Sequence, residues 1–306
     1  MPARRDGTLR VVADDADPVP GPPLPLGRRE LLRGRGTTFV REVPGPPGAP
    51  TVLLLHGWMA SGGLNWFQAF EPLGERYRVL AVDLRGHGRG IRSRRRFRLT
   101  DCADDAAVLV EQLGAGPVIA VGYSLGGPVA QLMWKRHRHL VRGMVLAATS
   151  HHLMPDQREQ MVFASVMAAA AGSTRVGQVV MHLPSRQLRS WLPTRTPIRP
   201  DSLREWARAE MSRHDPRHIL EAGIALANYR ATWVDQVDVP TTVLVTTKDR
   251  AVNPRAQLTM AARIPGAAVH HIDDGHVVCA KPSFGRVLRD AVDSVESRAR
   301  GARGLA

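Results

Sequence analysis

The chain of 306 residues is predicted to fold as an α/β protein with a mostly parallel, doubly wound sheet and a helical lid insertion. Three observations predict this class. Short, continuously apolar segments alternate with amphipathic ones, which is typical of parallel strands buried on both faces. About ninety residues between the fourth and fifth apolar segments lack a strand pattern, and a serine flanked by glycines directly follows one strand.

The N-terminal part of the chain predicts a tail followed by a hairpin. Residues 1–24 are rich in proline, aspartate and glycine and show no periodicity, so we expect no regular structure there. Two β-like stretches within residues 29–43 then lead into the turn cluster Pro44-Gly45-Pro46-Pro47-Gly48. We expect these stretches to pair at the edge of the sheet.

The core domain is expected to span residues 25–150 and 236–306, because an α/β domain of this length can form a single unit. The apolar runs predict its parallel strands at residues 51–55, 79–82, 118–121, 143–147, 241–246 and 268–272. Amphipathic periodicity predicts its helices at residues 66–76, 101–114, 125–136, 254–263 and 284–297.

The insertion, residues 151–235, is far longer than an ordinary connection, and we expect it to form a helical lid over the active site. Its helical segments are predicted at residues 157–171, 176–183, 202–213 and 217–229. Its large apolar side chains line a cavity in one interpretation and form the core of a small subdomain in the other; they are Met161, Met167, Met181, Trp191, Trp206, Met211 and Trp233.

The strongest local motif surrounds Ser124, in Val121-Gly122-Tyr123-Ser124-Leu125-Gly126-Gly127. A nucleophile on a sharp turn from strand to helix needs small neighbours, which Gly122 and Gly126 supply. The serine would then lie at the carboxyl end of the sheet, where a helix N-terminus favours negative charge. A glycine-rich turn of this kind also suits a nucleotide site, so the motif needs support from the rest of the chain.

An earlier strand ends in Leu54-Leu55-His56-Gly57-Trp58, and this turn is where a second oxyanion donor is expected. The proposed donors are the backbone N–H groups of Trp58 and Leu125, which would stabilise a tetrahedral oxyanion. We expect the His56 side chain to brace the loop and to take no part in catalysis.

The carboxylate partner is expected at Asp249, which follows the strand Val243-Leu244-Val245-Thr246 directly in the later part of the core. In some related arrangements the acid instead follows the strand before the insertion. That position here reads Thr149-Ser150-His151-His152, without a carboxylate before Asp156. The sequence therefore favours Asp249, with a helix-capping role as the alternative.

The general base must follow the acid, which leaves three histidines. His270 and His271 lie within a strand-like run, whereas His276 follows the turn Asp273-Asp274-Gly275 and would extend from the carboxyl edge of the sheet. We expect His276 to take the proton of Ser124 and return it to the leaving group, with Asp249 holding the imidazole in the required tautomer. His151 and His152 are expected either to face the pocket or to lie on the surface.

Taken together in chain order, these motifs resemble the α/β-hydrolase superfamily, in its lid-bearing branch of bacterial esterases, carbon–carbon bond hydrolases and cofactor-free haloperoxidases. The resemblance covers roughly residues 50–290 and includes Asp83-Leu84-Arg85-Gly86-His87-Gly88, in which Asp83 and His87 resemble loop-stabilising residues of the family. Members with an aspartate nucleophile, such as epoxide hydrolases, are disfavoured because position 124 is serine.

The resemblance implies the α/β-hydrolase fold and a serine hydrolase that cleaves a carboxylic ester or thioester. The apolar side chains of the expected lid favour a hydrophobic acyl group. It implies a small-molecule substrate and neither a cofactor nor a metal ion. Carbon–carbon cleavage, perhydrolysis or acyl transfer on the same triad stays open, as does a non-catalytic protein that binds a ligand in the lid cavity. A homo-oligomer also stays open.

The net charge of +14 suggests nucleic acid or an anionic membrane as a partner, but only three of the 42 basic residues are lysine. This skew resembles a genomic composition bias, and the basic run at residues 85–98 has only Phe97 as aromatic support. We therefore expect no nucleic-acid partner and no stable membrane insertion, with peripheral contact to anionic lipid as an alternative. Two cysteines and no signal-like apolar stretch predict a cytoplasmic protein.

Overall fold

The computed structural model describes residues 21–153, 158, 160–162, 164–170 and 203–304. Its centre is an eight-stranded sheet in the order β1-β2-β4-β3-β5-β6-β7-β8, with every neighbouring pair from β4 to β8 parallel. The strands are β1 (Gly27–Leu32), β2 (Gly36–Val43), β3 (Thr51–Leu55), β4 (Arg78–Val82), β5 (Val118–Tyr123), β6 (Val141–Ala147), β7 (Thr241–Thr246) and β8 (Ala268–Ile272).

The predicted hairpin is confirmed, because β1 and β2 pair antiparallel at one edge of the sheet. All six predicted parallel strands are also present, three of them with the predicted bounds. Strands β3, β5 and β7 are buried along their whole length, as expected for parallel strands covered on both faces of the sheet.

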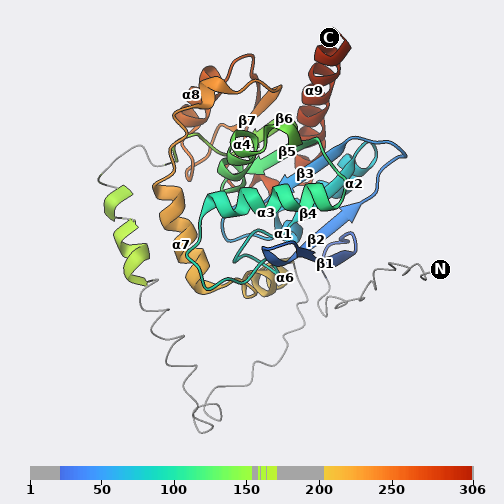
Figure 1. Cartoon of the computed structure of the whole chain (residues 1–306). Helices are drawn as coiled ribbons and strands as arrows, with labels where there is room; N and C mark the ends of the chain where they lie inside the picture. Colours follow the sequence, from blue (N-terminus) through green and yellow to red (C-terminus); the bar gives the residue numbers. More distant parts are fainter. Residues whose placement is uncertain (1–20, 154–157, 159, 163, 171–202, 305–306) are drawn as a thin grey trace, which may run out of the picture.

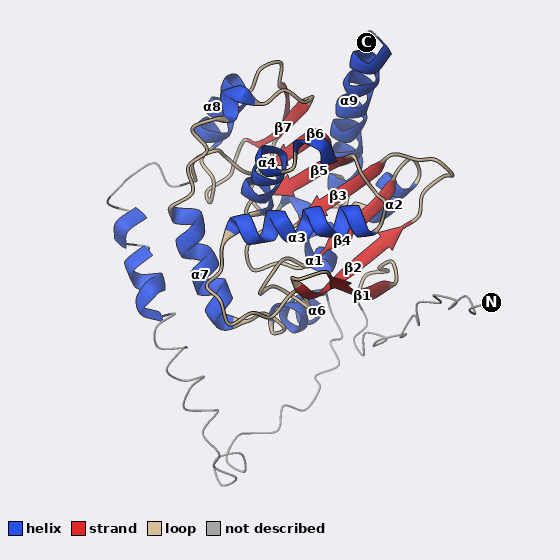
Figure 2. Ribbon diagram, in the orientation of Figure 1, coloured by secondary structure: helices blue, strands red, loops and turns tan. Residues whose placement is uncertain are grey.

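Helices cover both faces of the sheet (Figure 1, Figure 2). One apolar cluster joins the sheet to α3 (Leu99–Gln112), α4 (Gly126–Arg136), α7 (Pro216–Ala227) and α8 (Pro254–Arg263). The other joins the opposite face to α1 (Gly62–Trp66), α2 (Phe70–Gly74) and α9 (Phe284–Gly304). Short 3₁₀ turns lie at η1 (Arg138–Leu140), η3 (Val234–Gln236) and η4 (Val278–Ala280). The doubly wound architecture predicted from the sequence is therefore present.

The single helix predicted at residues 66–76 is wrong, because this segment holds the end of α1 and all of α2. Ser61 begins α1 earlier than predicted, since its hydroxyl accepts a hydrogen bond from the Leu64 N–H. Pro72 cannot donate to the carbonyl of Gln68, and it is tolerated here because it lies in the first turn of a new helix. In contrast, α9 continues seven residues beyond the predicted end at 297.

Within the insertion, the predicted helices at 202–213 and 217–229 correspond to α6 (Leu203–Met211) and α7. Residues 158, 160–162 and 164–170 are helical, inside the segment predicted at 157–171. The helix predicted at 176–183 and the first 20 residues of the predicted tail lie outside the described residues. In its described part, the segment predicted to lack strands contains an isolated antiparallel bridge between His152 and Arg230.

The large apolar side chains of the insertion have different environments. Trp206 is buried, whereas Trp233 stacks on Trp134 of α4 with ring centroids 5.7 Å apart. Met161 is exposed, and Met181 and Trp191 lie outside the described residues. The cavity interpretation therefore applies to Trp206 and Met211, which line a cavity, whereas Trp233 packs on the main core and not within a separate subdomain core. Within the described segments, no helix is both long and apolar enough to cross a bilayer.

Candidate active site

Ser124 lies on a sharp turn between β5 and α4 with a positive φ of 50°, a conformation that non-glycine residues rarely adopt. The chain is packed so tightly around it that two neighbours must be glycine. A Cβ on Gly122 would lie 2.3 Å from the Gly126 carbonyl oxygen, and a Cβ on Gly126 would lie 1.9 Å from that of Leu55. This packing supports the strained turn that exposes the serine hydroxyl.

Ser124, His276 and Asp249 form one hydrogen-bonded chain. His276 Nε2 lies 3.0 Å from Ser124 Oγ, and His276 Nδ1 lies 2.8 Å from Asp249 Oδ2. The three residues come from the β5–α4 turn, the loop after β8 and the loop after β7, which meet at the carboxyl edge of the parallel sheet. Such a geometry allows the imidazole to accept the serine proton while the carboxylate orients the ring.

The Asp249 side chain is buried and held in its ionised form by donors. Its Oδ1 accepts hydrogen bonds from the backbone N–H groups of Ala251 and Val252, and its Oδ2 accepts one of 2.7 Å from the Thr246 hydroxyl. Burial by itself raises the pKa of this carboxyl, but the hydrogen bonds from His276, Val252 and Thr246 outweigh it and lower the pKa below its ordinary value. The carboxylate can therefore stabilise an imidazolium.

The turn after β3 lies against Ser124, since a Cβ on Gly57 would be 3.4 Å from the Ser124 Cβ. The predicted bracing role of His56 is confirmed. Its Nδ1–H donates to the Gly57 carbonyl at 2.8 Å, and its Nε2 accepts from the Leu84 N–H at 2.9 Å. Burial lowers the pKa of His56 to about 3, so the ring is neutral and suited to these two roles.

The Asp83 to Gly88 segment also stabilises loops, as the family resemblance implies. Asp83 is buried and accepts hydrogen bonds from the backbone N–H groups of Gly62 and Arg89, both 2.7 Å long. His87 is buried, and its Nδ1 lies 3.0 Å from the Arg85 carbonyl oxygen. These contacts connect the loop after β4 to the start of α1.

A cavity of about 540 Å³ opens beside Ser124 and His276. Its described lining is mainly apolar and includes Trp58, Leu64, Phe67, Trp206, Met211 and Val277. His151 and His152 are not among the described residues that line it, and His270 and His271 lie on β8. The cavity thus combines a serine hydroxyl with space for an apolar group.

The sequence profile of the alpha/beta hydrolase fold matches residues 50–280. The chain belongs to this family. Among solved structures, a hydrolase from Pseudomonas aeruginosa PA01 superimposes with a TM-score of 0.69 at 21% identity, covering 87% of this chain and 97% of that one. At this identity the superposition shows that the two proteins share the α/β-hydrolase fold.

Curated relatives of this α/β hydrolase match over shorter segments. The proline iminopeptidase PfmaB of Pestalotiopsis fici is 35% identical over 129 residues, which are 40% of this chain and 45% of the relative. A pimeloyl-[acyl-carrier protein] methyl ester esterase of Chromobacterium violaceum is 38% identical over 108 residues, 35% of this chain and 40% of the relative. The chain thus spans less than half the length of these relatives.

Two residues that support the site of this α/β hydrolase were missed by the sequence analysis. The Tyr123 hydroxyl donates a hydrogen bond to the His276 carbonyl, and the centroids of the Tyr123 and His276 rings are 5.8 Å apart. Asn65 Oδ1 accepts a 2.8 Å hydrogen bond from the Gly57 N–H. Tyr123 stood within the serine motif, but its partner lies 153 positions away along the chain, and no local pattern indicates such a contact.

Proposed function

We propose that this protein is a serine hydrolase that cleaves a carboxylic ester or thioester through an acyl-Ser124 intermediate. The observation that carries the proposal is the hydrogen-bonded chain from Ser124 Oγ through His276 to Asp249, next to the apolar cavity. The esterase among its relatives is consistent with this activity but matches only part of its own length.

In the proposed reaction, Ser124 Oγ attacks the acyl carbon while its proton passes to His276 Nε2. The tetrahedral oxyanion accepts hydrogen bonds from the backbone N–H groups of Trp58 and Leu125, the latter at the N-terminus of α4. The imidazolium then protonates the leaving alcohol or thiol, and the acyl–Ser124 ester remains. A water molecule, deprotonated by His276, attacks this ester; as the acyl carbon–Oγ bond breaks, the imidazolium returns its proton to Ser124 Oγ and the carboxylic acid is released.

The cavity supports an apolar acyl group as substrate. Trp206 of α6 is buried at the cavity wall, and its ring meets Phe67 edge to face with centroids 5.9 Å apart. The insertion thereby supplies part of the binding surface, and we propose that residues 151–235 act as a cap on the core of residues 25–150 and 236–306. Burying each methylene of the substrate against this wall contributes about 0.8 kcal/mol to binding.

The test is a stopped-flow assay on p-nitrophenyl esters with acyl chains of increasing length. Wild type is expected to release a burst of p-nitrophenol equal to the enzyme concentration, because acylation by this good leaving group is faster than water attack and the acyl-enzyme accumulates. Ser124→Ala is expected to show no burst and to lose at least about 10⁴-fold in kcat. Ser150→Ala is the matched control, since Ser150 is buried and its hydroxyl donates to the Ala256 carbonyl.

The outcomes separate the competing functions. Turnover without covalent labelling of Ser124 by a phosphonate would contradict the acyl-enzyme. A folded wild type that is inactive on all esters but cleaves a diketone would favour carbon–carbon hydrolysis. Peroxide or alcohol outcompeting water as acyl acceptor would indicate perhydrolysis or transfer. Ligand binding without any turnover would favour a non-catalytic role.

A further inference from the structure

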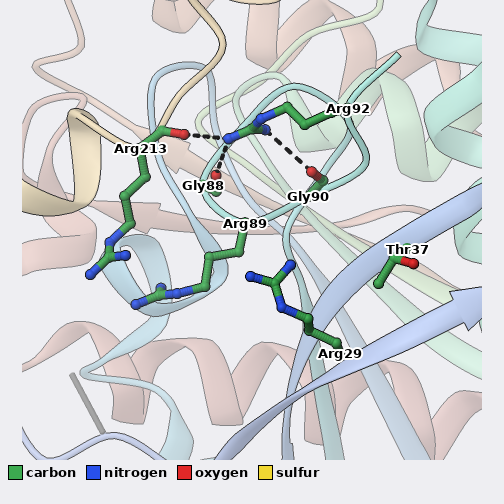
Figure 3. A pocket seen from close by; sticks show the side chains of 7 residues that line it. All are labelled: Arg29, Thr37, Gly88, Arg89, Gly90, Arg92 and Arg213. Carbon is green, nitrogen blue, oxygen red and sulfur yellow. Dashed lines mark hydrogen bonds between the residues drawn. The ribbon is translucent and has the colours of Figure 1, made fainter. Parts of the chain in front are cut away.

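A second cavity lies where the basic loop at residues 85–98 meets the β1–β2 hairpin. Its volume is about 500 Å³, and its described lining contains Thr37, the 88–90 turn and four arginines, Arg29, Arg89, Arg92 and Arg213. In Figure 3 the Arg29 side chain rises from β1 toward the loop that carries Arg89 and Arg92, while Arg213 approaches from the other side. The cavity is therefore lined by four arginines from three segments of the chain.

Contacts within the protein hold two of these groups in place. The Arg89 guanidinium lies 5.0 Å from the centroid of the buried Phe39 ring, and its Nη1 is 3.2 Å from Glu210 Oε1. Arg92 Nη2 donates to the carbonyls of Gly88 and Arg213, and its Nη1 donates to that of Gly90 (Figure 3). Because these side chains are already positioned, ordering them on ligand binding costs less free energy.

Among the described residues that line the cavity, four are arginines and none is acidic. Glu210 is shared, since its carboxylate contacts both Arg89 and, at 3.1 Å, Arg213 Nε. None of the described residues forms an ion pair with Arg92, whose contacts are to carbonyls. Burial lowers the pKa of Arg92, the charges of Asp215 and Asp83 raise it, and that of Arg29 lowers it further. A bound anion would relieve this repulsion.

We propose that this cavity binds the phosphate group of a small phosphorylated molecule. A phosphate monoester carries close to two negative charges and three acceptor oxygens, which planar guanidinium groups bind in a bidentate way. No aromatic side chain is among the described lining residues, so the cavity lacks the stacking surface that single-stranded nucleic acid requires.

Helix α6 lines part of the catalytic cavity and contacts arginines of the second cavity through Glu210. Glu210, the partner of Arg89, also accepts a 3.0 Å hydrogen bond from the Ser61 hydroxyl, and the next residue, Met211, lines the catalytic cavity. The phosphate group has two sources that fit this position. It is part of the leaving group of the hydrolysed substrate, or it belongs to a separate effector that acts through α6.

Isothermal titration with inorganic phosphate at 0.15 M salt tests the binding directly. Wild type is expected to bind one phosphate, and Arg29→Gln to weaken the affinity about tenfold, because one charge-assisted contact is lost. Arg29 is exposed on β1, so its replacement leaves the core intact. Arg213→Gln is expected to weaken binding similarly. Arg96→Gln, in the same basic loop but outside the cavity, serves as the charge-matched control and is expected to bind within twofold of wild type.

The absence of phosphate binding to wild type would overturn the proposal. So would an equal loss in Arg29→Gln and Arg96→Gln, because the attraction would then come from net charge alone. Thermal melts of each variant, compared with wild type, show whether a loss of phosphate binding is caused by unfolding. This binding test does not depend on catalysis, so its result is independent of the proposed hydrolase activity.

Kinetics then distinguish the two sources and rest on the proposed function. Thioesters with the same acyl group are compared on a neutral thiol and on a thiol that carries a phosphate monoester. A KM about tenfold lower for the phosphorylated thioester, lost in Arg29→Gln, assigns the phosphate to the substrate. If the two thioesters have equal KM values, and added phosphate changes the rate on the neutral thioester, the phosphate group belongs to an effector. If neither effect is observed, the result contradicts a functional role for the cavity.

Discussion

The Trp58 indole Nε1–H donates a 2.8 Å hydrogen bond to the backbone carbonyl of Ile219, 161 positions later in the chain. Trp58 follows β3 and lines the catalytic cavity, while Ile219 lies in α7 of the insertion. The backbone N–H of Trp58 is also a proposed oxyanion donor. One residue therefore joins the insertion to the turn on which the proposed chemistry depends.

Replacing Trp58 with phenylalanine keeps this backbone N–H but removes the bond to Ile219. A carbonyl left without its partner costs about 1–3 kcal/mol. We expect the melting temperature to fall by roughly 2–6 °C and kcat on the preferred ester to fall about tenfold. Trp233→Phe removes an indole from the insertion without touching this turn, and it is expected to keep kcat within twofold. Equal kcat for both variants would show that the Ile219 contact does not position the turn.

Asp249→Asn tests the role of the carboxylate beside His276. The amide is uncharged and presents a donor to the ring, so the imidazole loses both the tautomer that accepts the serine proton and its stabilising charge. We expect kcat to fall about 10⁴-fold with little change in KM. Asp273→Asn is the control, because Asp273 is exposed and pairs with Lys248. A loss below tenfold in Asp249→Asn would remove Asp249 from the proposed mechanism.

Gly126→Ala tests the packing behind the serine turn. The new Cβ would lie 1.9 Å from the Leu55 carbonyl oxygen, and both atoms belong to segments held by the sheet and by α4. We expect the free energy of unfolding, measured in urea, to fall by about 3 kcal/mol or more. Gly301→Ala is the control, since nothing lies within 4 Å of its new Cβ in α9 and alanine favours a helix. That variant is expected to match or exceed wild type.

Asp215 makes stability depend on pH at the N-terminus of α7. Its carboxylate accepts hydrogen bonds from the N–H groups of Arg217 and His218 and lies 3.3 Å from His218 Nδ1. Burial raises the pKa of Asp215, but the contacts with His218 and the charge of Arg217 lower it to about 2. Because the pKa of Asp215 is lower in the folded protein than its unfolded value of about 3.9, the carboxylate stabilises the fold above pH 4. This contribution is lost as the pH falls toward 2.

The contribution at neutral pH is on the order of 2 kcal/mol, and about half of it should be lost by pH 3. Asp215→Asn keeps a capping oxygen but cannot titrate. Urea unfolding at pH 7, 5, 4 and 3 is therefore expected to show a smaller loss of stability for the variant than for wild type. Parallel pH dependence of the two proteins would mean that Asp215 is not the titrating group.

The strands were the most predictable part of this fold. Residues 51–55, 241–246 and 268–272 form strands with the predicted bounds, because a proline, a glycine or a polar residue lies within two positions of each end. The helix predicted at 66–76 was wrong for a reason that the periodicity hides. A break at Phe67 and a proline at position 72 leave the apolar spacing nearly unchanged while dividing the backbone hydrogen bonds between two short helices.

The sequence by itself determined the class of the fold, the order of its strands along the chain and the turns that carry Ser124, Asp249 and His276. These features depend on local patterns: apolar periodicity, glycines beside a serine, and polar residues at strand ends. Only the tertiary structure decided which distant groups meet, including Tyr123 with His276, Trp58 with Ile219 and the four arginines around one cavity. Such contacts depend on how the helices and loops pack on the sheet, and side chains far apart in the chain leave no periodic signal of their meeting.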